Sequence, residues 1–159
     1  MDEAAGMDRD SLLELAGASS GPGRVASVER AAGEGFMAPL HAHAGDEAVH
    51  VVEGRVTIFA GAEIVTLGPG ETFVVAEGVA HTLRVESPRA RAVFTTFTAS
   101  AGRYEDFLRA TGPVSVGPSG SPVWATAEDA RGVGAAAAAA NVTVYGPPGL
   151  LAVDARITA

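Results

Sequence analysis

Short segments with alternating apolar and polar residues fill the sequence between Val25 and Phe97. Residues two apart on a β-strand share a face, and glycine or proline separates nearly every pair of segments. The segments are 25–28, 49–52, 55–59, 63–67, 72–75, 81–85 and 92–97. Many short strands at even spacing are typical of a β-sandwich or barrel. The sequence therefore predicts an all-β domain.

Helical patterns flank this β-rich region. Residues 10–15 combine a capping residue with an apolar face, which predicts a short N-terminal helix. Residues 102–110 place Tyr104, Phe107 and Leu108 on one face, as expected for a helix that packs over a sheet.

The rest of the chain is expected to form an extension of the barrel. Alanine, the residue with the highest helix propensity, fills much of 128–140 and predicts a second helix. Residues 111–122 form a Gly/Pro/Ser linker, and residues 142–159 cannot be one regular element because prolines interrupt them. We divide the chain into an N-terminal arm (1–24), a β-barrel (25–100) and a helical C-terminal extension with its linker (101–159).

Three of the four histidines form a pattern together with one glutamate. His41 and His43 are two residues apart, Glu47 follows with the same parity, and His81 comes much later. If His41 and His43 lie on a strand, both side chains point to the same face. Three imidazoles and one carboxylate can bind a single divalent transition metal. A His-x-His pair alone is equally compatible with structural histidines, so the glycines around it matter.

The first of two glycine-framed segments resembles the first cupin motif. That motif reads glycine, five residues, His-x-His, three or four residues, glutamate, six residues, glycine. Gly35, His41, His43, Glu47 and Gly54 fit it at every position.

The second segment resembles the second cupin motif. Gly70, Gly78 and His81 fit, while Ala76 stands where the motif has proline and Val85 where it has asparagine. Neither departure touches a metal ligand of the motif. The chain thus resembles the cupin superfamily from about residue 25 to 100, and the resemblance implies a double-stranded β-helix, the cupin jelly-roll barrel. The extension is similar to that of small bacterial monocupins of the quercetin 2,3-dioxygenase-like kind.

The ligand set indicates one divalent transition metal per chain, held by His41, His43, Glu47 and His81. Imidazole and carboxylate ligands suit Fe, Ni, Mn, Co and Zn alike, and affinity order does not choose among them. An ion that accepts five or six ligands keeps open positions beside four protein ligands, as catalytic metals do.

The resemblance implies a mononuclear non-haem dioxygenase of the quercetinase-like type, acting with dioxygen on a small hydroxylated or enolisable substrate. Glu47 would be the catalytic proton acceptor. Two alternatives stay open, because a fold does not determine a function. One is a metal-dependent isomerase or lyase that acts on a small sugar or keto acid. The other is a non-catalytic cupin that binds a small molecule.

Apolar residues around the barrel mouth are expected to line the substrate pocket. The candidates are Met37, Phe59, Phe73, Leu83, Val85 and Phe97. His50 and Arg84 have the opposite parity to Glu47 and His81, so we expect them to face away from the metal. Asp46 is left out of the site for the same reason.

The composition of the chain limits the kinds of binding partner and the location that we expect for the protein. The net charge is −8 at pH 7 and argues against nucleic acid. Cysteine is absent from the sequence, so neither disulfides nor thiol chemistry are expected. The acidic N-terminus does not resemble a secretory signal, and the apolar stretch 132–153 is too rich in alanine, glycine and proline to span a membrane. We therefore expect a cytoplasmic protein. Single-domain cupins commonly pair through sheet edges, so a homodimer is expected.

Overall fold

The computed structural model describes residues 12–13, 25–97, 101–111, 114–116, 122–124 and 127–155. Strands dominate these ranges, and two helices follow the main group of strands. The strands are β1 (Leu12–Leu13), β2 (Val25–Gly33), β3 (Leu40–His43), β4 (Glu47–Glu53), β5 (Val56–Ala60), β6 (Glu63–Leu67), β7 (Thr72–Val75), β8 (His81–Val85), β9 (Arg89–Phe97), β10 (Val114–Val116), β11 (Pro122–Trp124) and β12 (Val142–Gly146). The helices are α1 (Ala101–Ala110) and α2 (Ala127–Ala139).

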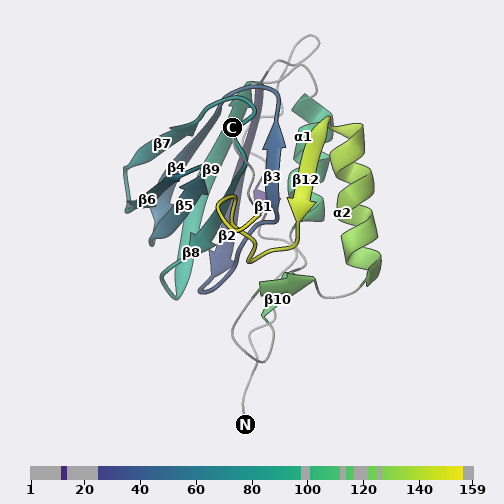
Figure 1. Cartoon of the computed structure of the whole chain (residues 1–159). Coiled ribbons are helices and arrows are strands. Elements are labelled where there is room, and N and C mark those ends of the chain that lie inside the picture. The colour runs from purple at the N-terminus through teal and green to yellow at the C-terminus, as the bar shows by residue number, and fades with distance from the viewer. Residues whose placement is uncertain are drawn as a thin grey trace.

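Two five-stranded antiparallel sheets build the barrel (Figure 1). Their strand orders are β1-β2-β9-β4-β7 and β12-β3-β8-β5-β6. Buried apolar side chains from both sheets, such as Val49, Phe94 and Ile58, form one core between them. Each such side chain contributes about 1.5–3 kcal/mol when fully buried. The predicted all-β double-stranded β-helix is confirmed.

The predicted period of two appears directly in the burial along the strands. In β9, Ala90, Ala92, Phe94 and Thr96 are buried, while their neighbours in sequence are more exposed. Because alternate residues of a strand point to opposite faces, this pattern places one face of β9 on the core.

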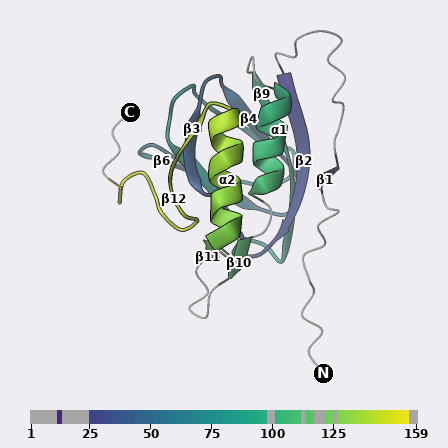
Figure 2. The ribbon, with the colours of Figure 1, turned by 90° about the vertical axis from the view of Figure 1, so that its right-hand side faces the viewer.

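The two helices cover one side of the barrel (Figure 2). Helix α1 packs against β2, α2 packs against β12, and the helices also contact each other. The face predicted for α1 is the buried one, since Tyr104, Phe107 and Leu108 are all at most 5% exposed. Within the ranges given above, neither helix is long and apolar enough to cross a membrane.

The last strand, β12, belongs to a barrel sheet although it follows both helices in sequence. It pairs with β3, and β3 lies between β12 and β8. All four residues of β3 are buried, so its backbone groups need partners on both sides. Residues 142–155 form a strand followed by turns, in keeping with the expectation that the tail is no single element.

Two expectations are corrected where the structure describes the chain. The predicted N-terminal helix includes Leu12–Leu13, which form a short strand paired with Glu29 and Arg30; the rest of that helix lies outside the described residues. A six-residue helix has few internal hydrogen bonds, and a strand edge offers partners instead. The predicted linker contains β10 and the first residue of β11, and these two strands pair antiparallel. Valines at 114, 116 and 123 favour this pairing.

Candidate metal centre

The three motif histidines lie together inside the barrel. His41 and His43 come from β3, and His81 comes from β8, where it is the register partner of His41. Register partners and residues two apart share a face, so all three rings turn to the interior. Each histidine is at most 6% exposed. One ring nitrogen of each lies within 4.8 Å of the others.

Positive backbone φ angles at the motif glycines help to place these strands. Gly35, Gly54, Gly70 and Gly78 have φ of 81°, 76°, 83° and 75°, as predicted from their positions at turns. At Gly54 a side chain would also collide with the backbone of the strand β9. The glycine frame is therefore a requirement of the turns that carry the histidines.

Each imidazole is held by a hydrogen bond from its Nδ1 to a backbone carbonyl. The acceptors for His41, His43 and His81 are Pro39, Gly45 and Val79, at 2.8, 3.0 and 2.8 Å. Because a carbonyl oxygen can only accept, Nδ1 carries the hydrogen in all three rings. The lone pair of each neutral ring is then on Nε2.

The three Nε2 atoms are buried and have no hydrogen-bond partner in the described part of the chain. A buried polar atom without a partner is costly and calls for an explanation. Histidine ligands of metals are typically oriented in this way, with one nitrogen bonded to a carbonyl and the other on the ion. The three histidines could thus bind a metal, and they are three of the four predicted ligands.

Glu47 faces the histidines from β4, on the opposite sheet. Its Oε1 lies 3.5 Å from Nε2 of His81, and its Oε2 lies 3.6 Å from Nε2 of His43. Oε2 also accepts hydrogen bonds from the Thr96 hydroxyl at 2.8 Å and from the Tyr104 phenol. The structure therefore brings all four predicted ligands together, and Oε1 is the carboxylate oxygen that neither hydroxyl occupies.

Burial and charge set the protonation of this group. Burial by itself would raise the pKa of Glu47, but the adjoining imidazoles of His43 and His81 hold it well below its usual range. Burial, and then the charge of His81, lower the pKa of His41 to about 3. Burial and the Glu47 carboxylate raise the pKa of Tyr104 well above its usual value, so its phenol stays a hydrogen-bond donor.

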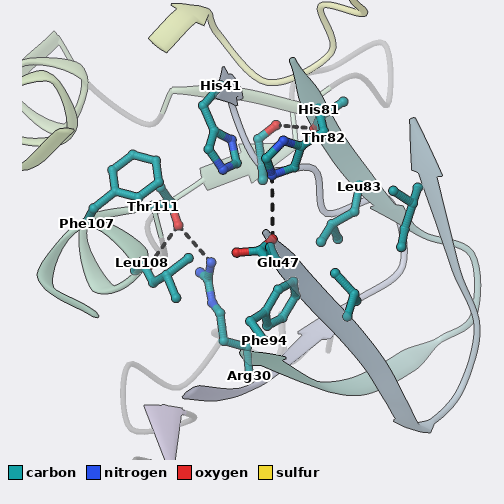
Figure 3. Close-up of a pocket in the computed structure, with 13 residues that line it drawn as sticks. Arg30, His41, Glu47, His81, Thr82, Leu83, Phe94, Phe107, Leu108 and Thr111 are labelled. Atoms are coloured by element: carbon teal, nitrogen blue, oxygen red, sulfur yellow. Dashed lines mark hydrogen bonds and ion pairs between the residues drawn. The ribbon is translucent and has the colours of Figure 1, made fainter. Parts of the chain in front are cut away.

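A small cavity adjoins the histidines and Glu47 (Figure 3). Its polar lining comes from Arg30, His41, Glu47, His81, Thr82 and Thr111. Leu83, Phe94 and Phe107 are among its apolar walls. The volume open to the centre of a water molecule is about 20 Å³. This is room for one or two waters, or for a molecule of a few heavy atoms.

The part of the chain that resembles a known family lies within the predicted β-barrel, residues 25–100. The family described as the cupin domain matches residues 27–97. These residues hold both glycine-framed segments, all four candidate ligands and the strands β3 to β9. This part of the chain is therefore similar to the cupin domain. None of the curated proteins compared with the sequence matches it.

Solved structures with similar folds come from several bacteria. A conserved protein of unknown function from Streptococcus pyogenes is 18% identical over 48% of this chain and 66% of its own, with a TM-score of 0.46. TT1209 from Thermus thermophilus is 28% identical over 47% of this chain and 73% of its own, with a TM-score of 0.45. Oxalate decarboxylase from Bacillus subtilis is 21% identical over 48% of this chain and 22% of its own, with a TM-score of 0.45. This chain therefore covers just under two thirds of the first structure and about a fifth of the last.

The residues predicted to line the substrate pocket lie in different surroundings. Leu83 lines the cavity beside the histidines, and with Val85 it also lines a second cavity nearby. Phe73 packs against the core. Phe97 ends β9 and is 57% exposed.

Two further candidates lie next to the outward-facing Arg84. Met37 is buried and forms an isolated β-bridge with Arg84. The guanidinium of Arg84 lies over the ring of Phe59, 5.4 Å from its centroid. Met37, Phe59, Phe73 and Phe97 do not line the cavity beside the histidines.

The polar residues predicted to face away do so. His50 hydrogen-bonds the Thr72 hydroxyl at 2.8 Å on the outer face of the sheet. Arg84 forms an ion pair with Glu86. A carboxylate oxygen of Asp46 accepts a hydrogen bond from the backbone of Glu77 at 2.9 Å.

Three residues of the site, Thr96, Tyr104 and Arg30, were not predicted from the sequence. Thr96 has the parity of the buried Phe94, and Tyr104 was expected to face the sheet, but nothing in the sequence pairs either with Glu47. Arg30 has the inward parity of Val28 on β2. A charged residue at a position expected to face the core, such as Arg30, could have been recognised as a site candidate from the sequence alone.

Proposed function

We propose that the protein is a metal-dependent cupin enzyme that holds one divalent transition metal per chain. His41, His43 and His81 would bind through Nε2, and Glu47 would bind through Oε1. The observation that carries this proposal is the set of three buried Nε2 atoms that have no hydrogen-bond partner among the described residues, while a carbonyl fixes the other nitrogen of each ring. Ligands of this kind suit Fe, Ni, Mn, Co or Zn.

A metal in this position would supply Lewis-acid activation of a substrate oxygen and, if redox-active, chemistry with dioxygen. The chain's own residues supply the proton transfer. Glu47 is ionised and buried, and two hydroxyls already donate to its Oε2, so Oε1 is the atom that would accept a substrate proton once it no longer binds the metal. Tyr104 and Thr96 keep the carboxylate in place while that proton moves.

The reaction we propose first is a dioxygenase reaction of the quercetinase-like kind on a small hydroxylated or enolisable substrate. The buried carboxylate next to open metal positions supports it. The volume of the cavity favours a substrate of few heavy atoms, and a flavonol would enter only if the side chains around Leu83 and Phe107 moved. The small volume of the cavity also favours a second candidate, an isomerase or lyase that acts on a small keto acid or sugar.

Elemental analysis of the purified protein tests the metal. We expect about one transition metal per chain, retained in His50→Ala and lost in His41→Ala. His50 is the matched control because its ring hydrogen-bonds Thr72 outside the barrel. Full metal content in His41→Ala would refute the site.

Two further results separate the activities. Little metal in the wild type, even after reconstitution with iron, nickel and manganese, would indicate a non-catalytic binding cupin. In a metal-loaded protein, uptake of oxygen with an enolisable acid supports the dioxygenase, and turnover without oxygen supports the isomerase or lyase. A homodimer and a cytoplasmic location remain predictions; sedimentation and cell fractionation test them.

A further inference from the structure

Arg30 places a positive charge in the cavity beside the proposed metal site. It lies on β2 at an inward position, on the same face of the strand as the buried residues Ala26 and Val28. Figure 3 shows its side chain reaching from β2 towards Thr111 and the Glu47 carboxylate. It lines the same cavity as Glu47, His41 and His81.

Within the part of the chain that the structure describes, the contacts of Arg30 leave most of its N–H donors without a partner. Its Nη1 donates to the Thr111 hydroxyl at 2.7 Å, and its guanidinium lies 5.3 Å from the centroid of the Phe36 ring. Among the described residues, no carboxylate is within ion-pairing distance of it, although Arg84 and Arg91 both have such partners. A guanidinium has five N–H donors in a planar fork that matches a carboxylate.

The charges around the cavity favour an anion. Burial lowers the pKa of Arg30 to about 10, but the side chain remains charged at neutral pH. Arg30 and Glu47 carry one charge each of opposite sign, and neutral imidazoles add none. A divalent metal would therefore leave two positive charges uncompensated in a site with little solvent, which is unfavourable unless an anion enters.

We propose that Arg30 binds a carboxylate group of the substrate in this cavity, which makes the substrate a small organic acid. The inference rests on the proposed function, because it places that carboxylate next to the proposed metal. The acid has few heavy atoms, since the cavity is small. Arg30 thus selects the substrate by charge, while Glu47 acts on the proton.

A structural role for Arg30 makes a different prediction. Thr111, its hydrogen-bond partner, follows α1 and itself donates to the carbonyl of Leu108 at 2.7 Å. Arg30 could therefore serve only to tie β2 to the end of α1. Thr111→Val breaks this link but keeps the charge of Arg30, so the two roles can be told apart.

The experiment compares acetate with acetamide, which has the same shape but no charge. Both are titrated into zinc-loaded protein and followed by NMR, with zinc content measured in every variant. We expect the wild type to prefer acetate and Arg30→Gln to bind it about tenfold more weakly or worse, the loss expected for a hydrogen bond to a charged group. Arg30→Lys should be intermediate, and Thr111→Val should stay within about threefold of the wild type.

Acetate binding at wild-type strength in zinc-loaded Arg30→Gln would overturn the inference, and so would equal losses in Arg30→Gln and Thr111→Val. If Arg30→Gln does not fold, the Nε–H signal of Arg30 in the wild type decides. It should shift with acetate and not with acetamide, and an unmoved signal refutes the proposal. Should the wild type bind no zinc, the proposed function fails, while the same titration of metal-free protein still tests Arg30.

Discussion

Tyr104, on the helix that follows the barrel, donates a hydrogen bond from its phenol to the carboxylate of Glu47 on β4. The two residues are far apart in sequence, and both are at most 2% exposed. The T-shaped contact between the Tyr104 and His43 rings, with centroids 4.9 Å apart, brings the same side chain against a second candidate ligand. The helix α1 is therefore part of the candidate metal centre.

We expect Tyr104→Phe to weaken metal binding because Glu47 loses one of its two hydroxyl donors. Loss of a group that orients a ligand typically lowers metal affinity 10- to 100-fold, so about tenfold or more is expected here. Saturated protein should still hold one metal per chain. Competition with a chelator measures the affinity. Tyr145→Phe, which changes an exposed tyrosine, is the control. Equal affinities in the two variants would show that Tyr104 does not orient a ligand.

The stability of the metal-free protein should depend on pH through His41. Folding lowers its pKa from 6.5 to about 3, so the unfolded chain binds a proton in this range that the folded chain does not. The free energy of unfolding therefore falls as the pH falls from 6.5, by up to about 1.4 kcal/mol per pH unit. The lowered pKa of Glu47 acts in the same direction, but only below its usual value of 4.5.

The range from about pH 4.5 to 6.5 isolates the contribution of His41. We measure the free energy of unfolding with urea at several pH values in this range. It should change less steeply with pH in His41→Gln than in the wild type. His50→Gln, which removes a histidine outside the barrel, should keep the wild-type slope. The assignment to His41 is wrong if the two variants behave alike.

The features predicted from the sequence are those set by local spacing. The parity of His41, His43 and Glu47 placed three candidate ligands on inward faces, and the glycine frame located their turns. Contacts between distant segments were not predictable in this way. The amphipathic spacing of α1 showed that Tyr104 would face the sheet, but its contact with Glu47 depends on how the helix sits on the barrel. The sequence likewise does not distinguish an aromatic residue in a cavity wall, such as Phe107, from one at an exposed strand end, such as Phe97.

Gly54 offers a direct test of the glycine frame. Its φ is 76°, and a Cβ there would meet the backbone of Arg89 and Ala90. We expect Gly54→Ala to lower the free energy of unfolding by about 3 kcal/mol or more, from backbone strain and the collision together. Gly78 has nearly the same φ, 75°, but open space around it. Gly78→Ala should cost only the strain, about 1–2 kcal/mol. Similar losses in the two variants, measured by urea unfolding, would contradict the role of close packing.

The strand that carries His41 and His43 depends on the C-terminal part of the chain. The strand β3 pairs with β8 at one position only, where His41 lies opposite His81. It pairs with β12 at four positions. Val142 lies opposite His43, and Val144 lies opposite His41. The backbone of β3 is therefore paired mainly with residues that follow both helices.

A protein that ends at Asn141 should consequently lose the metal centre together with stability. Without β12, the buried strand β3 keeps its backbone groups but has no partner for them on one side, and each such group is costly to bury. We expect this truncation to bind zinc at least tenfold more weakly than a control that ends at Ala155, and to unfold at lower urea. Isothermal titration and urea unfolding measure both effects. If the protein that ends at Asn141 binds zinc like the control, the residues before 142 hold the site without β12, and β12 only covers the edge of the sheet.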